Sequence, residues 1–157
     1  MNFSEINFLM SKALDYAHEG FRRDEVPVGA VIVDSNGLII AEAFNTKEKE
    51  QQCCHHAEIL AIEKASKYLG SWRLNGCTLF VTLEPCIMCM GAIAHARLEA
   101  VYFGAYDPKG GALSLGYKLN KDMRLNHKFK VYGGFKHLEC SKLISDFFKQ
   151  KRRRYRS

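Results

Sequence analysis

The sequence predicts a three-layer α/β domain built around a mixed central sheet. β-rich segments alternate with segments of helical periodicity along the 157 residues, which is the pattern of an α/β fold. An Asn-Gly pair separates the first two β-rich segments, and this arrangement is typical of an antiparallel hairpin. The segment at 77–83 consists almost entirely of β-forming residues, as a central strand buried on both faces does. We therefore expect a sheet, mixed because of its initial hairpin, between two layers of helices.

The N-terminal half predicts a helix, a hairpin and a second helix. The first helix is expected from Ser4, a candidate N-cap, to about Arg23. Its apolar positions recur at helical spacing at Ile6, Leu9, Met10, Ala13, Tyr16 and Ala17. The hairpin strands are expected at 28–34 and 38–44. The second helix is expected over 56–70, with Gly70 as its C-cap. Its predicted apolar face comprises Ile59, Ile62, Ala65 and Leu69.

The C-terminal half continues the alternation after the strand at 77–83. Pro85 suits the first turn of a helix that continues through "CIMCMGAIAHAR". A strand at 100–105 precedes a long glycine-rich loop, which ends before a short strand in "KVYGG". The last helix is expected from about His137, with inward-facing Leu138, Leu143, Ile144, Phe147 and Phe148. With no internal repeat or linker, the chain is expected to form a single domain over 1–157.

The composition is that of an ordinary globular protein, with 47% hydrophobic and 25% charged residues. The opening "MNFSEINFLM" has neither a basic leader nor a small-residue cleavage site, so it predicts a helix rather than a signal peptide. The longest apolar run, 86–94, is far shorter than the roughly 20 residues that a membrane span needs. These features predict a soluble, cytoplasmic protein.

The positive charge is concentrated at the end of the chain. The net charge is +6, and the last nine residues contain six basic side chains and no acid. These residues are Lys149, Lys151, Arg152, Arg153, Arg154 and Arg156, and we call 149–157 the basic tail. Such a block favours a polyanionic partner, most simply nucleic acid, although a solvated and frayed terminus would have the same composition.

The chain has six cysteines. Because thiols stay reduced in the cytoplasm, the predicted location, the C-x-x-C pair indicates a metal or redox site and not a disulfide. Cys86 and Cys89 lie on one face at the start of a predicted helix, where the helix dipole favours thiolates, the form that binds zinc. His56, at the start of the preceding helix, is a third ligand. Three protein ligands leave one position for water, which is typical of a catalytic zinc site. Glu58 is expected on the inward face of its helix, where it is the candidate general base.

The combined pattern H-x-E…P-C-x-x-C is typical of zinc-dependent deaminases of cytosine and adenine. Two other interpretations remain open at this point. A structural zinc site would need a fourth ligand from Cys53, Cys54 or His55, which we otherwise interpret as loop or packing residues. A zinc-stabilised RNA-binding module would have no catalytic use for Glu58.

Longer motifs extend the similarity along nearly the whole chain. "PVGAVIV", Asn45, "HAEILAI", "TLEPCIMCMGAI", "VYFGAYDPKGGA" and "SDFF" resemble the tRNA-specific adenosine deaminases. "CCH" at 53–55 replaces the Pro-Thr-Ala usual before the zinc histidine in that family. The resemblance implies the cytidine deaminase fold, a homodimer with one Zn²⁺ per subunit, and conversion of adenosine to inosine at the wobble position of a tRNA anticodon.

The resemblance also implies substrate-binding residues. Asn45 matches an asparagine that contacts the base, and Asp107 matches an aspartate beside the ribose of the neighbouring nucleotide. Gly29 and Ala30 are expected either to let the backbone approach the base or to serve only strand packing. The basic tail is expected to hold phosphates near an anticodon base that is splayed into the pocket.

The expected reaction is hydrolytic. Water activated by the metal attacks C6 of adenine, and Glu58 takes the water proton. Glu58 then protonates the ring nitrogen and, later, the departing amine. The alternative within enzymes is a deaminase of a free base or nucleoside, such as cytosine, guanine or cytidine.

Overall fold

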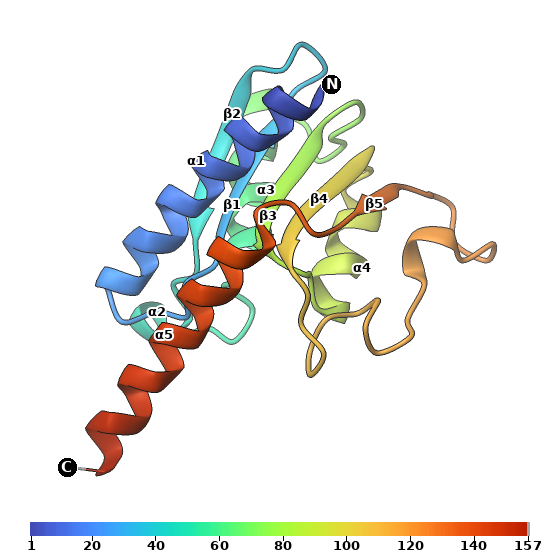
Figure 1. The fold of residues 1–157 in the computed structure, drawn as a ribbon. Coiled ribbons are helices and arrows are strands. Elements are labelled where there is room, and N and C mark those ends of the chain that lie inside the picture. The colour runs from blue at the N-terminus through green and yellow to red at the C-terminus, as the bar shows by residue number, and fades with distance from the viewer. Residues whose placement is uncertain (157) are drawn as a thin grey trace.

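The computed structural model describes residues 1–156, and its centre is a mixed five-stranded sheet (Figure 1). The strands are β1 (Gly29–Val33), β2 (Ile39–Phe44), β3 (Thr78–Leu83), β4 (Ala100–Ala105) and β5 (Lys130–Tyr132). Their order across the sheet is β2-β1-β3-β4-β5. β1 runs antiparallel to both of its neighbours, whereas β3, β4 and β5 are parallel to one another. The predicted hairpin and mixed sheet are confirmed.

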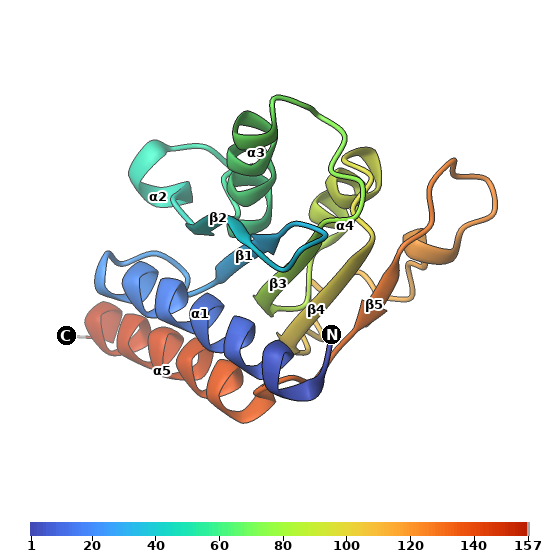
Figure 2. The same ribbon diagram turned by 90° about the horizontal axis from the view of Figure 1, so that it is seen from above.

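Helices cover both faces of the sheet, as Figure 2 shows. On one face lie α1 (Phe3–Arg22) and α5 (His137–Arg156), and on the other lie α3 (Ala57–Leu69) and α4 (Ile87–His95). The short helix α2 (Lys47–Glu50) and the 3₁₀ turn η1 (Leu119–Lys121) lie in connections and were not predicted. Within residues 1–156, no helix is both long and apolar enough to span a bilayer. The predicted three-layer architecture is confirmed.

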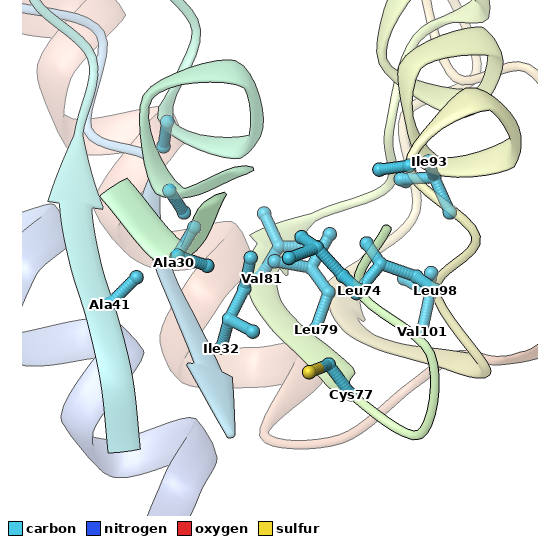
Figure 3. Close-up of a cluster of buried hydrophobic side chains, with 14 of the residues drawn as sticks. Ala30, Ile32, Ala41, Leu74, Cys77, Leu79, Val81, Ile93, Leu98 and Val101 are labelled. Carbon is cyan, nitrogen blue, oxygen red and sulfur yellow. The ribbon is translucent and has the colours of Figure 1, made fainter. Parts of the chain in front are cut away.

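Two apolar clusters hold the layers together, one on each face of the sheet. Figure 3 shows the cluster between the sheet and the helices α3 and α4, with Ile32, Val81 and Ile93 among its members. Every fourth residue of α3 on this face is alanine, and each is fully buried: Ala57, Ala61 and Ala65. Small side chains let α3 lie close to the sheet, which brings its first turn near the strand ends.

The helix starts differ from prediction at two positions. α1 is capped by Asn2 and not by Ser4, since the Asn2 Oδ1 accepts from the Glu5 N–H and the Glu5 Oε2 accepts from the Asn2 N–H, both at 2.9 Å. This is a capping box, which satisfies two N–H groups reciprocally. Pro85 lies before α4 and not in its first turn, because Cys86 is the N-cap.

Two predicted apolar faces were also partly wrong. Leu69 is 42% exposed, and the buried positions of α3 are the three alanines and Glu58. On α5, Leu138 is 80% exposed and Phe148 is 42% exposed. The residues that α5 buries are Cys140, Leu143 and Phe147. These three share one narrow stripe at helical spacing, whereas Leu138 falls on the opposite face of the helix and Phe148 lies to one side of the stripe.

The basic tail continues α5 as regular helix to Arg156 and is not frayed. Asp24, in the turn that follows α1, pairs with two of its side chains. The Asp24 carboxylate lies 2.9 Å from Arg154 Nη1 and 3.7 Å from Lys151 Nζ. The tail therefore has a defined course beside the end of α1.

Sheet topology determines where the functional residues meet. Since β1 is antiparallel to both β2 and β3, the C-terminal ends of β2 and β3 lie at the same edge of the sheet. The chain leaves β2 through α2 and enters α3 at His56, and it leaves β3 and enters α4 at Cys86. The starts of α3 and α4 are thus brought together at one edge.

Candidate metal centre and active site

His56, Cys86 and Cys89 form a group whose ligand atoms lie within 4.8 Å of one another. His56 and Cys86 are the N-caps of α3 and α4, and Cys89 is the third residue of α4. The His56 Nδ1 lies 3.7 Å from the Cys86 Sγ and 3.6 Å from the Cys89 Sγ. Tetrahedral zinc with ordinary bond lengths requires an N···S separation of about 3.6 Å. The donor set and its geometry therefore fit zinc, with Nδ1 as the nitrogen that faces the sulfurs.

The surroundings of the two thiols shift their pKa values in opposite directions. The hydrogen bond from Cys89, supported by His56, lowers the pKa of Cys86 to about 4. The same hydrogen bond, together with burial, raises the pKa of Cys89. Both residues lie at a helix start, where unpaired N–H groups favour the thiolate. Because zinc binds thiolates, a metal held here would require both thiols to be deprotonated.

Cys53, Cys54 and His55, the candidates for a fourth ligand of a structural zinc site, lie outside the ligand group. Cys53 and Cys54 are exposed, and their sulfurs lie 3.7 Å from each other. The His55 Nδ1 lies 2.5 Å from a carboxylate oxygen of Glu50. Within residues 1–156, the metal-competent group therefore contains three ligands. Three ligands leave one coordination position for water or substrate, which is the arrangement of a catalytic site.

Glu58 lies beside the ligand group, as predicted from its inward position on α3. Its side chain is buried, and its Oε2 lies 2.6 Å from the Cys89 Sγ and 4.0 Å from the His56 Nδ1. Burial raises the pKa of Glu58 above the ordinary range of a carboxyl. A carboxyl group in this environment can both take up and release a proton beside the metal position.

Asn45 links the end of β2 to the start of α3. It is buried, and its Oδ1 accepts a hydrogen bond of 2.7 Å from the N–H of Ala57, the residue after His56. One half of the Asn45 amide therefore anchors the backbone next to a ligand. Its Nδ2 makes no hydrogen bond to another group within residues 1–156.

Gly29 and Ala30 have packing roles in the structure. A Cβ on Gly29 would lie 1.9 Å from the carbonyl oxygen of Ala13, so this glycine lets α1 approach β1. Ala30 is fully buried in the cluster beneath α3. Their predicted contact with the base stays a prediction.

Asp107 lies in the loop that follows β4 and is half-buried. Its Oδ1 accepts hydrogen bonds from the N–H groups of Lys109 and Gly110, at 3.2 and 3.1 Å, which make a tight turn. This turn leaves Asp107 near the strand end that leads to Cys86, since the Asp107 N–H donates to Glu84 at 3.0 Å.

Sequence reasoning missed two buried carboxylates, Glu25 and Glu84, each 2% exposed. Glu25 accepts from the N–H groups of Glu48 and Lys49 at 2.9 and 2.8 Å, and so fixes α2 ahead of His56. Glu84 accepts from the loop after β4. The position of Glu84 in the sequence, between the apolar β3 segment and Pro85, could have indicated that it is buried.

The comparisons agree with this site. Residues 4–105 match the family described as the cytidine and deoxycytidylate deaminase zinc-binding region. The chain is 47% identical over 145 residues to the tRNA-specific adenosine deaminase of Bacillus subtilis (strain 168), and the match covers 92% of this chain and 89% of that protein.

Two solved structures extend the comparison. One comes from a study of A-to-I editing by tRNA:A34 deaminases at the wobble position of transfer RNA. It has a TM-score of 0.82 and 41% identity, and the match covers 87% of this chain and 98% of that one. A guanine deaminase from Bacillus subtilis has a TM-score of 0.62 and 38% identity, with coverage of 75% and 72%.

Replacing one ligand should remove the metal. Because two protein ligands hold zinc far more weakly than three, Cys86→Ser purified at neutral pH should contain much less than one zinc per chain by elemental analysis. Cys53→Ser, a change at an exposed thiol outside the group, should keep the zinc content of the unmodified protein. Equal zinc content in both variants would contradict the proposed ligand set.

Proposed function

Since this chain belongs to the tRNA-specific adenosine deaminases of the cytidine and deoxycytidylate deaminase family, we propose that it hydrolyses adenosine to inosine at the wobble position of tRNA. The observation that carries the proposal is the three-ligand zinc group with the buried Glu58 carboxylate 2.6 Å from one of its sulfurs. This arrangement combines an open metal position with a proton carrier, which is what hydrolytic deamination requires.

The protein's own part in the reaction is proton transfer and positioning. Bound zinc supplies Lewis acidity, which makes water a nucleophile near neutral pH. Glu58 accepts one proton of the attacking water and gives it to the ring nitrogen of adenine. It then takes the second proton, from the new hydroxyl on C6, and gives it to the amine, which leaves as ammonia while the C6 carbonyl forms. Its burial supports this role, because a raised pKa lets the carboxyl hold the proton between the two transfers.

Asn45 and Asp107 are proposed to recognise the substrate. The Asn45 amide is held beside His56 by its bond to Ala57, and its remaining donor is suited to an acceptor on the purine. Asp107 lies on the loop that borders the same sheet edge, where its carboxylate is suited to a ribose hydroxyl of the neighbouring nucleotide.

The alternative function is deamination of a free base, and the similarity to a guanine deaminase supports it. Two features favour RNA. The basic tail has no role in binding a small neutral base, and the higher identity, coverage and TM-score belong to tRNA deaminases. Cytoplasmic location follows as part of the proposal, because tRNA substrates and reduced thiols occur together there.

A homodimer is also proposed, through the outward face of α4. This helix is apolar on its buried side, and its outward face is also apolar except for His95 in the last turn. The outward positions are Ile87, Met88, Gly91, Ala92 and His95. A helix that is apolar all round is normally covered on both sides, and a second copy of the chain would cover this one next to its metal site.

The basic tail is proposed to contact RNA phosphates through four of its six basic side chains. Lys151 and Arg154 already pair with Asp24. Four other basic residues of the tail are exposed: Lys149, Arg152, Arg153 and Arg156. Each phosphate contact to single-stranded RNA contributes about 0.7 to the slope of log affinity against log salt, so four contribute roughly 3.

The function is tested with a tRNA that has adenosine at the wobble position. The unmodified protein should produce inosine in it, and should leave free guanine, cytosine and cytidine unchanged, as measured by mass spectrometry of nucleosides. Deamination of a free base without inosine formation in tRNA would overturn the proposal.

Glu58→Gln should lower kcat by at least the ~10²–10⁴-fold typical of an acid–base group, because the amide cannot carry the proton. Its zinc content should remain that of the unmodified protein, since Glu58 lies outside the ligand group. Glu63→Gln, the same change at an exposed site on α3, is the control and should keep full activity. A zinc-free Glu58→Gln protein would show a ligand role instead.

The dimer is tested by placing a charge on the proposed interface. Ala92→Lys should convert the protein to a monomer in sedimentation velocity, because a lysine there would have to be desolvated. Leu38→Lys adds the same charge at an exposed apolar position of the β1–β2 turn and should leave the oligomeric state unchanged. If the unmodified protein is itself monomeric, or Ala92→Lys remains dimeric, this interface is wrong.

The tail is tested by the salt dependence of RNA affinity. Changing Lys149, Arg152, Arg153 and Arg156 to Gln together should flatten the slope by about 3, while the pairs with Asp24 keep α5 in place. The control Lys67→Gln, near the far end of α3, should leave the slope unchanged. An unaltered slope in the fourfold variant would exclude the tail from binding.

A further inference from the structure

The loop after β4 is held by a single buried carboxylate, that of Glu84, which stands two residues before the first zinc sulfur. We propose that Glu84 is a positioning residue, which sets where Asp107 stands relative to the metal site and thereby the affinity for the nucleotide next to the target base. This inference rests on the proposed function, because Asp107 is assigned to RNA there.

Glu84 receives three hydrogen bonds, and all come from the two ends of one loop. Its Oε1 accepts from the Asp107 N–H at 3.0 Å and from the Ser114 Oγ at 2.5 Å. Its Oε2 accepts from the Ser114 N–H at 2.8 Å. The carboxylate therefore closes the segment 107–114 into a ring around itself.

The loop is shaped to fit that carboxylate. A Cβ on Gly111 would lie 2.2 Å from the Glu84 carboxyl carbon and from its Oε2, so the backbone of the loop rests directly against the charged group. One residue further on, the Ala112 N–H donates to the carbonyl oxygen of Pro85 at 2.9 Å. The loop therefore contacts both Glu84 and Pro85, the two residues that precede Cys86.

The charge of Glu84 makes this arrangement stiff. Glu84 is 2% exposed, and no ion pair is recorded for it within residues 1–156. A buried carboxylate without a cation is stable only while its oxygens accept hydrogen bonds. Moving the loop away would strip all three donors from it, so the loop is held in one place.

The anchor and the zinc ligands belong to one short stretch of chain. Glu84 follows β3, and Pro85 and Cys86 come next, with Cys86 as the N-cap of α4. The Glu84 N–H also donates to the Ala105 carbonyl oxygen at 2.8 Å, which ties this stretch to the end of β4. A displacement of Asp107 relative to the metal therefore requires that the bonds to Glu84 break.

Glu84→Gln tests the inference, because it keeps the shape of the side chain while one oxygen becomes an NH₂ group. Whichever way the amide is turned, one backbone N–H of the loop, that of Asp107 or of Ser114, loses its acceptor. The KM for an adenosine-wobble tRNA should rise roughly tenfold, as expected for a lost hydrogen bond to a buried charged group. The kcat should change less than twofold, and zinc content should be unchanged.

Three further variants sharpen the result. Ser114→Ala removes only the hydroxyl donor and should raise the KM less, in the same direction. Glu99→Gln, an exposed residue before β4, is the matched control and should leave the KM unaltered. In an Asp107→Ala background, Glu84→Gln should raise the KM less than twofold, because Glu84 acts by positioning Asp107. A further tenfold rise in this background would show that Glu84 does not act through Asp107.

Hydrogen exchange separates this inference from the proposed function. In Glu84→Gln the amide protons of Asp107 and Ser114 should exchange faster than in the unmodified protein, whatever the substrate is. Unchanged exchange and unchanged KM would refute the anchor, as would a loss of zinc in place of a KM effect. If the unmodified protein forms no inosine in tRNA, the proposed function fails, and the exchange rates alone decide whether Glu84 holds the loop.

Discussion

The structure depends on the meeting of two helix starts at one edge of the sheet. A zinc site needs its ligand atoms within a few ångströms of one another, and here they come from positions thirty residues apart in the chain. Antiparallel pairing of β1 with both β2 and β3 places the two strand ends together, and the alanine face of α3 lets its first turn come close. Each helix then begins with a member of the candidate ligand group as its N-cap, and at Cys86 the helix dipole favours the thiolate form that zinc binds.

Buried polar side chains hold the loops around this meeting point. Glu25 fixes α2, Asn45 fixes the backbone beside His56, and Glu84 fixes the loop that contains Asp107. In each case a side-chain oxygen accepts from backbone N–H groups of a segment distant in sequence. Such bonds give irregular segments a defined position without secondary structure, because the buried oxygen would otherwise lack a donor. Asp107 is thus held by a residue proposed only to position it, whereas Asn45 is proposed both to hold the backbone beside His56 and to bind the substrate.

The candidate zinc group shows which features short sequence motifs can predict. The spacing of Cys86 and Cys89 on one helix turn, with His56 and Glu58 at the start of another, predicted both the ligand set and the buried acid, and the structure brings these four side chains together. The β-rich segments, the hairpin and the helical periods were likewise predicted, since each depends on neighbours within a few residues. Asn2 was missed as a cap because Ser4 is an equally good N-cap by type.

By itself the sequence determined the order of strands and helices along the chain, because short-range periodicity decides it, and two short motifs at helix starts predicted the candidate ligands and the acid beside them. Only the tertiary structure decided what depends on distant backbone. It placed Leu138 and Phe148 outside the core, turned the basic tail into helix paired with Asp24, and assigned Glu84 to the loop at 107–114. Neither residue type nor spacing predicts these contacts, since a carboxylate acquires its donors only when separate segments are folded against it.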